Sequence, residues 1–271
     1  MARERVGTGV RSLELALGVL EVVVFSDQEW GVTQIADRLK VTKGSVHRHL
    51  QTFTDHGYLA QNPATARYAI GPKCRLLAAL APDADIVQVA AGPMRALRDA
   101  LGQTVVLSSM TPRGALVLTT LAGASPIAIG VRAGSELSFH ASAQGKVLLA
   151  FAPRPVQVRM LARALQPFTS KTVVDPERLD DELSRIRTCG FASAPEEVVL
   201  GINTIATPVF DDQDGCAAAL AIVGSIQHLP DRPAPAVIAA LKDASSRISR
   251  QLGHGGPASD GAVRAARHQT A

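Results

Sequence analysis

Cysteine, charge and long apolar runs are all scarce in this chain, and each scarcity excludes a class of protein. The 271 residues include only three cysteines, which lie far apart and form no C-x-x-C pair: Cys74, Cys189 and Cys216. This spacing indicates neither a zinc site nor a disulfide framework. We therefore expect a protein of a reducing compartment that holds no metal.

Long apolar segments are missing as well. No stretch of 18 uncharged apolar residues occurs, and the first residues, Met-Ala-Arg-Glu-Arg, are not followed by an apolar run of signal-peptide length. A membrane-spanning helix or an export signal would need such a run. The sequence predicts no membrane partner and a cytoplasmic location.

Charged residues make up only 19% of the chain, against 46% apolar residues. This composition is globular, and the length allows two domains with a sizeable core. The formal net charge of +4 is small, but residues 1–75 contain ten Lys and Arg against seven Asp and Glu. Most of the positive surplus lies in this N-terminal part, which is weak support for a nucleic-acid partner there.

What the sequence does contain is a compound pattern over residues 31–70. Apolar residues at i, i+1 and i+4 predict a short helix that begins near Thr33, a candidate N-cap: Ile35, Ala36 and Leu39. After a tight turn, a second apolar stripe recurs at i, i+4 and i+7: Val46, Leu50 and Phe53. Two helices joined in this way predict a helix-turn-helix.

The second helix leaves one face free. With Thr42 as its N-cap and Ser45 near N3, the polar residues on that face are Lys43, Gly44, Ser45, His47, Arg48 and Gln51. A recognition helix enters the major groove by its N-terminal end, where such side chains reach base edges or phosphates. We take these residues, together with Thr33, as candidate DNA contacts.

A small hairpin follows the second helix. Gly57 is a suitable residue to end that helix, the segment 58–60 alternates towards the turn signal Asn62-Pro63, and residues 67–70 return as a second strand. This hairpin is typical of a wing, with Arg67 near its tip for a phosphate. The alternative is a small helical module whose basic face contacts protein only, but the order helix, turn, helix, hairpin favours DNA binding.

The chain divides into four segments. The DNA-binding domain covers residues 10–72, with Ser12 as the cap of a first helix over 13–25. Residues 73–100 are expected to form linker and dimerisation helices, the second of them interrupted at Gly92-Pro93. A second folded domain covers 101–252, and the tail 253–271, which lacks apolar periodicity, is expected to be disordered.

The second domain mixes strands and helices without strict alternation. Strands are predicted at 104–110, 116–121, 127–132, 190–193, 202–210 and 216–223, and helices at 142–151, 156–165, 176–189 and 234–252. This order favours an α+β fold with a largely antiparallel sheet.

The segments that are similar to enzyme or metal-binding motifs each lack residues that those motifs need. The segment 140–146 is similar to a phosphate loop, but His140 and Val147 stand where Gly and Ser or Thr are needed, so Ser142 is better taken as a helix cap. The acidic run before Gly215 lacks the ligands of a calcium loop and predicts a hairpin turn. The adjacent carboxylates Glu196 and Glu197 are expected to be solvated or to cap a loop. We therefore expect no catalytic residues and no cofactor.

These residues resemble the IclR family of bacterial transcriptional regulators. The resemblance rests on VTQIADRLKVTKGSVHRHLQTFTDHGYL (32–59) with the closing YAIGPK, and on LSFHASAQGKVLLAF (137–151), EEVVLGINTIATPVFDDQDG (196–215) and AALAIVG (218–224). It covers nearly all of residues 10–252. Both blocks occur in the order that the family has.

The resemblance implies a winged helix-turn-helix and a C-terminal GAF-like domain that binds a small metabolite and alters operator affinity. It also implies a homodimer or a dimer of dimers on double-stranded DNA. We expect a sequence-specific regulator, a repressor that also acts on its own promoter. The alternative is a non-catalytic small-molecule-binding or protein-interaction module without specific DNA recognition.

The departures from the family pattern concern specificity. In members that bind small oxoacids, an acidic residue stands at the position of Ala194, a thiol at that of Thr204, and hydroxyls at those of Ala221 and Val223. In the recognition helix, Gly44 stands where the family more often has Ser. Burying a small carboxylate without paired donors is costly. We therefore expect a larger or more apolar effector, such as an aromatic acid, in a site formed by Ala143, Gln144, Ala194, Ile202, Thr204, Ala221 and Val223.

Overall fold

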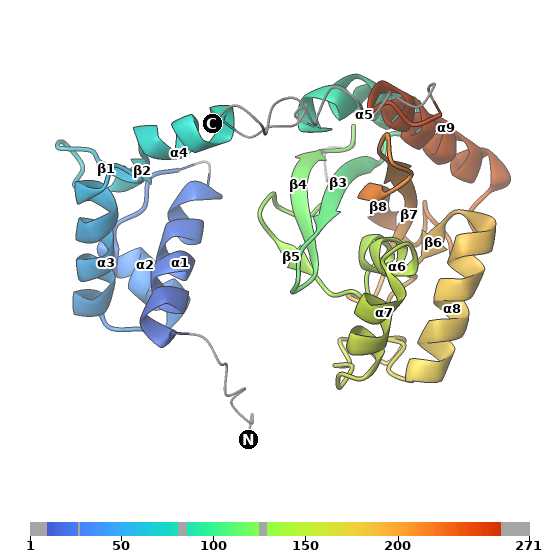
Figure 1. The fold of residues 1–271 in the computed structure, drawn as a ribbon, viewed down its shortest axis with the longest axis horizontal. Coiled ribbons are helices and arrows are strands. Elements are labelled where there is room, and N and C mark those ends of the chain that lie inside the picture. Colours follow the sequence, from blue (N-terminus) through green and yellow to red (C-terminus); the bar gives the residue numbers. More distant parts are fainter. Residues whose placement is uncertain (1–9, 27, 81–85, 125–128, 256–271) are drawn as a thin grey trace, which may run out of the picture. The chain divides into compact units, whose positions relative to one another are not determined.

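The computed structural model describes residues 10–26, 28–80, 86–124 and 129–255. It consists of two compact units that divide between residues 83 and 84 (Figure 1). The first unit contains a three-helix core with a hairpin, and the second contains a six-stranded sheet with helices on both faces. Both units agree with the α+β fold expected from the sequence.

The first unit contains α1 (Arg11–Val24), α2 (Val32–Leu39), α3 (Lys43–Asp55), β1 (Leu59–Gln61), β2 (Tyr68–Ile70) and α4 (Pro72–Ala79). The apolar stripes of its first three helices meet in one core, where Val19, Ile35 and Leu50 are fully buried. Leu59 of β1 and Tyr68 of β2 close this core from the hairpin side. Burying three amphipathic stripes together explains why these short helices are stable.

Two predicted caps in this unit are wrong. Val10, not Ser12, is at the N-cap of α1, and Ser12 lies in its first turn. Gly31, not Thr33, is at the N-cap of α2, because the side chain of Gln34 reaches back and accepts the Gly31 N–H at 3.1 Å. Thr33 is consequently an exposed residue inside the first turn of α2.

The second unit contains α5 (Ile86–Leu101), β3 (Thr104–Met110), β4 (Ala115–Leu121), β5 (Glu136–Leu137), α6 (Ala143–Ala150), α7 (Arg154–Leu161), α8 (Pro176–Cys189), β6 (Ala192–Ser193), β7 (Ile202–Phe210), β8 (Cys216–Ser225) and α9 (Pro235–Gln251). Its strands are ordered β5-β4-β3-β8-β7-β6, and every neighbouring pair is antiparallel. The antiparallel sheet that the sequence favoured is therefore confirmed.

Helices cover both faces of this sheet. On one face, Leu107, Val209 and Leu220 pack against α5 and α9, and on the other, Ala206, Ala219 and Ala221 pack against α6 and α8. Successive residues of a strand point to opposite faces, so a strand covered on both sides is apolar throughout. This explains the unbroken apolar run of β8. The alanines let α6 lie close to the sheet.

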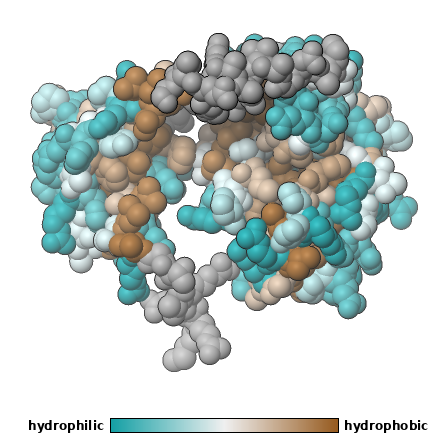
Figure 2. Space-filling view, viewed as in Figure 1, coloured by the Kyte–Doolittle hydropathy of each residue, from teal (hydrophilic) through white to brown (hydrophobic). Residues whose placement is uncertain are grey.

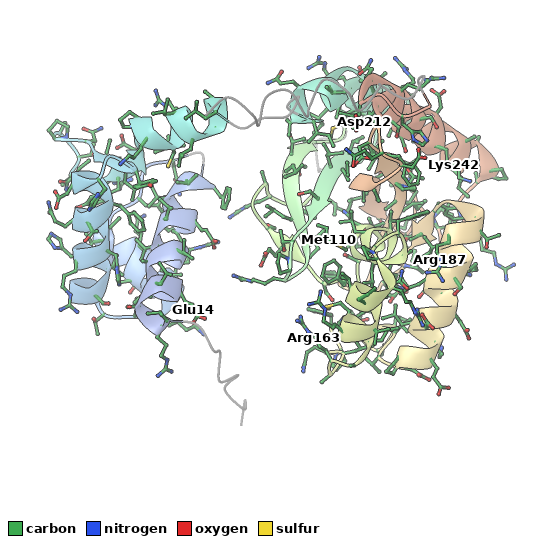
Figure 3. All side chains as sticks on the ribbon, in the orientation of Figure 1. Glu14, Met110, Arg163, Arg187, Asp212 and Lys242 are labelled. Atoms are coloured by element: carbon green, nitrogen blue, oxygen red, sulfur yellow. The ribbon has the colours of Figure 1, made fainter. Side chains whose placement is uncertain are left out.

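Long side chains tie the helix ends together. Arg187 on α8 donates to the carbonyl of Ala150 at the end of α6 at 3.2 Å, and Lys242 on α9 donates to the carbonyl of Cys189 at the end of α8 at 2.6 Å (Figure 3). The last carbonyls of a helix have no intrahelical partner, so cations there satisfy them.

Several expectations for this unit differ from the structure. α5 continues through Pro93, whose ring is buried, and packs on α9 and β3, so this helix belongs to the second unit and not to a separate linker. Residues 129–132 form no strand, whereas residues 127 and 128 lie outside the described part. Of the expected disordered tail, residues 256–271 are also outside it. No described helix is both long and apolar enough to cross a lipid bilayer.

Candidate DNA-binding surface and effector site

The cap of α3 sets the position of its polar face. Thr42 has extended backbone geometry, and its hydroxyl accepts the Ser45 N–H at 3.3 Å, as predicted. Val46 and Leu50 face the core, which leaves Lys43, Gly44, His47, Arg48 and Gln51 exposed and Ser45 half-buried on the other side. The structure thus brings five of the six candidate contacts on α3 together at one exposed surface, and Ser45 lies apart from them. Their contact with DNA stays a prediction.

The hairpin lies directly after α3. Gly57, with φ of +76°, ends the helix, and its backbone then turns into β1. Arg67 is exposed and immediately precedes β2, at the end of the connection and not at its tip. Trp30 extends the hairpin by exchanging two backbone hydrogen bonds with Tyr68, of 3.0 and 2.8 Å. The wing is therefore paired to the body of the unit.

The candidate effector residues lie on one face of the second sheet. Thr204 of β7 pairs directly with Val223 of β8, and Val223 pairs on its other side with Thr104 of β3. Ile202 and Ala221 share the same face one row away on either side, and the Ala194 N–H donates to the Thr204 carbonyl at 3.0 Å. Strand register thereby holds four of the seven candidates, and the backbone hydrogen bond holds Ala194 beside them.

The remaining two, Ala143 and Gln144, form the first turn of α6. Ser142 caps this helix and accepts the Gly145 N–H at 3.0 Å, which confirms the expected cap. A Cβ on Gly145 would lie 2.3 Å from the Ser138 carbonyl, so only glycine lets the preceding loop wrap this turn. Gln144 is 1% exposed, and neither atom of its amide has a hydrogen-bond partner among the described residues. Unsatisfied buried groups are uncommon, so this amide is suited to bind a ligand.

A cavity of about 580 Å³ begins at the same row of the sheet. Thr104, Val223 and Ile129 contribute to its wall, and Gln103 and His228 to its lining farther along. A cavity with mainly apolar walls and a few polar groups is typical of small-molecule sites. Val223 is the candidate effector residue that lines this cavity, and Thr204 is its neighbour in the sheet.

The second unit also contains a buried ionic cluster that sequence patterns did not indicate. The ammonium of Lys146, on α6, is fully buried and donates to Glu182 at 2.9 Å and to Glu197 at 2.5 Å. Glu197 is 4% exposed, so the expectation that it is solvated is wrong, whereas Glu196 caps its loop by accepting the Gly201 N–H at 2.9 Å. Burial raises the pKa of the Glu197 carboxyl, an effect that Lys146 opposes.

His140 joins the loop before α6 to a distant carbonyl. Its Nε2 lies 2.9 Å from the Gln166 carbonyl, which can only accept, so Nε2 carries the proton and Nδ1 accepts from the Ser138 hydroxyl at 2.7 Å. Burial, together with the nearby Lys146 charge, lowers the pKa of His140. A neutral, doubly hydrogen-bonded imidazole here is structural and not catalytic.

The two units together define a class: a winged-helix DNA-binding protein with a separate ligand-binding domain. The family model described as "IclR helix-turn-helix domain" matches residues 12–63, and the one described as "Bacterial transcriptional regulator IclR C-terminal" matches 78–250. The chain therefore belongs to the IclR family of transcriptional regulators. It is a regulator with a helix-turn-helix domain and an effector-binding domain, and not an enzyme.

Individual relatives agree along nearly the whole chain. The transcriptional regulator BhcR of Paracoccus denitrificans is 31% identical over 95% of this chain and 91% of its own. The crystal structure of an IclR regulator from Alicyclobacillus acidocaldarius has a TM-score of 0.73 at 25% identity and covers 90% of this chain and 100% of that one. An IclR homologue from Microbacterium hydrocarbonoxydans, crystallised with 4-hydroxybenzoate, has a TM-score of 0.73 at 23% identity. It covers 89% of this chain and 98% of that one.

Proposed function

We propose that the protein binds an operator with α3 in the major groove and the wing on the flanking backbone. The observation that carries this proposal is the capped, exposed N-terminal half of α3, where Lys43, His47 and Arg48 lie on one surface. Helix-turn-helix proteins place this part of the recognition helix against base edges. Arg67, exposed beside the wing, is suited to a phosphate.

A mobility-shift assay with DNA from the upstream region of its own gene tests this proposal. We expect binding that weakens as salt rises, because cationic side chains displace counterions from the phosphates. Dimeric protein that binds neither this DNA nor neighbouring promoters would favour the protein-interaction alternative. Because two of the relatives are named repressors, we expect reporter expression to rise when the gene is deleted. Acting on DNA, the protein would work in the cytoplasm.

The protein is proposed to act as a homodimer or a dimer of dimers. Leucines on α1, on α4 and at the residue after α4 are exposed in the single chain: Leu13, Leu17, Leu76, Leu77 and Leu80. Figure 2 shows this apolar colouring on the surface of the first unit. Exposed apolar patches of this kind mark association surfaces. Light scattering on the purified chain tests this, and a monomer at micromolar concentration would refute it.

The effector is proposed to be an aromatic or similarly apolar acid. Ala194, Ala221 and Val223 offer no hydrogen-bonding side chain, and the adjoining cavity has room for more than a two-carbon acid. The unpartnered Gln144 amide and the first turn of α6 would hold its polar end.

Isothermal titration can compare two groups of probes. We choose 4-hydroxybenzoate, because an IclR homologue was crystallised with it, and benzoate, against glyoxylate and pyruvate. We expect binding of the aromatic acids and a change in operator affinity with them. Tight binding of glyoxylate or pyruvate, with none of the aromatic acids, would overturn this proposal.

A further inference from the structure

A single carboxylate, that of Glu29, holds the connection between β1 and β2 from outside the hairpin. Its Oε1 accepts from the Asn62 amide at 2.9 Å and its Oε2 from the Thr65 hydroxyl at 2.9 Å. These two partners lie 33 and 36 residues away, at the start and near the end of the connection. Glu29 therefore fixes the connection at two points.

The neighbouring residues make this attachment rigid. Trp30 pairs with Tyr68 through two backbone hydrogen bonds, its indole N–H donates to Ser26 at 2.6 Å, and the Arg38 guanidinium lies 5.6 Å from its ring centroid. Glu29 is thus one residue from a point that is itself anchored. The hydrogen bonds from Asn62 and Thr65, and then the Arg67 charge, hold the pKa of Glu29 below its ordinary value, so the carboxylate is charged at neutral pH.

The connection itself has an unfavourable backbone. Ala66 has φ of +54°, a left-handed conformation that residues other than glycine rarely adopt. Such a residue persists where its surroundings fix it. Here the Ala66 N–H donates to the Asn62 carbonyl at 2.8 Å, the Asn62 N–H donates to the Arg67 carbonyl at 2.8 Å, and the Arg67 N–H donates to Thr65 at 3.3 Å. Both residues held by Glu29 are therefore the ones that shape the backbone at Arg67.

We propose that Glu29 is a positioning residue for DNA binding, which fixes the wing so that the Arg67 side chain meets a phosphate. This inference rests on the proposed role of Arg67. Arg67 is exposed, and its guanidinium makes no hydrogen bond to the described residues, although its charge acts on Glu29. Its backbone, however, is placed by the two residues that Glu29 holds.

Whether removing Glu29 weakens or strengthens DNA binding distinguishes a positioning role from simple charge repulsion. A carboxylate near a DNA backbone repels it, so removing an acidic side chain without a positioning role strengthens binding or leaves it unchanged. Removing Glu29 weakens binding if it positions the wing. Asp37 is a matched control, because it is an exposed acid on α2 whose carboxylate has no described hydrogen bond.

The test measures operator affinity of the full chain over a series of KCl concentrations. We expect Glu29→Ala to weaken binding about three- to tenfold and to reduce the slope of log K against log salt by about one phosphate contact. Glu29→Gln, which keeps an oxygen that accepts from Asn62, stays closer to wild type, and Asp37→Asn binds as well as wild type or better. Because Arg67→Ala loses the same contact, the double variant Glu29→Ala/Arg67→Ala is no weaker than Arg67→Ala alone.

Three results would overturn the inference in distinguishable ways. If Glu29→Ala binds DNA as tightly as Asp37→Asn while Arg67→Ala binds more weakly than wild type, the role of Glu29 is refuted but the contact by Arg67 is not. Arg67→Ala that binds like wild type refutes the proposed wing contact on which the inference rests. If Glu29→Ala lowers the melting temperature of the first unit, Thr65→Val is tested in place of Glu29→Ala. A salt slope in Thr65→Val equal to that of wild type then refutes the inference.

Discussion

Lys146 and Glu197 form a buried ion pair, with Nζ and Oε1 2.5 Å apart, which joins α6 to the segment that carries Ala194. The second carboxylate, Glu182 on α8, completes the hydrogen bonding of the ammonium. Three separate parts of the second unit therefore meet at one charge: α6, α8 and the segment after β6. A ligand that displaces Ala194 or the first turn of α6 would also displace an element that holds this ion pair.

The first prediction concerns this ion pair. Lys146→Met leaves Glu197 buried without its counter-ion, and breaking a buried pair in this way costs about 3–5 kcal/mol. We expect a loss of this size in the free energy of unfolding, measured by urea denaturation. The double variant Lys146→Met/Glu197→Gln removes both charges and should recover part of the loss. A single variant as stable as wild type would contradict the importance of the pair.

The second prediction is a pH dependence from His140. Its pKa in the folded protein lies below the ordinary value of 6.5, so below that pH the unfolded chain binds a proton more readily than the folded one. The stability that His140 contributes is therefore complete above about pH 7 and falls as pH drops through 6.5. Urea unfolding between pH 7.5 and 5.5 measures this slope.

His140→Gln supplies the control for that slope. Its amide can donate to the Gln166 carbonyl in place of the imidazole Nε2–H, and it does not titrate. We expect the difference in stability between wild type and variant to shrink steadily as the pH falls. A constant difference over the range would show that His140 does not titrate differently on folding.

The elements that sequence patterns predicted best have clear end signals. α8 begins at Pro176 behind the capping carboxylate of Asp175 and ends at Cys189, just before Gly190 with φ of +72°, so its bounds were predicted to the residue. The strand β7 was predicted equally well, because β-branched residues recur along its whole length, from Ile202 to Val209. Likewise, the polar face of α3 followed from the spacing of Val46 and Leu50.

What sequence patterns could not supply are pairings between distant residues. Lys146 and Glu197 are separated by 51 positions, and the apolar residues after Glu197, Val198 to Leu200, are exposed while the carboxylate itself is buried. The same holds for Glu29 and the wing. The cap of α2 was missed because the acceptor came from the side chain of Gln34 and not from the usual N-cap residue. Such contacts depend on the tertiary fold.

The third prediction concerns Arg48, which is exposed on α3 one residue from His47. Arg48→Ala should weaken operator binding by roughly 1–3 kcal/mol if the guanidinium reads a base, and relax specificity at that base pair. A phosphate contact would instead weaken all sequences by a smaller, uniform amount. Fluorescence anisotropy with the operator and a scrambled duplex separates the two cases. Arg75→Ala, an exposed arginine on α4, is the matched control, and equal effects of the two variants would remove Arg48 from the site.

The last prediction concerns Gly44, in the first turn of α3. A Cβ added there meets no atom within 4 Å, and the backbone is helical, so the glycine is not needed for folding. Gly44→Ala should raise the free energy of unfolding by about 0.5 kcal/mol, because alanine loses less conformational freedom in a helix. We expect operator affinity to stay within about twofold of wild type. If affinity falls tenfold or more while stability rises, the Cα of Gly44 must approach the DNA so closely that no side chain fits, and glycine at this position would then be a determinant of binding.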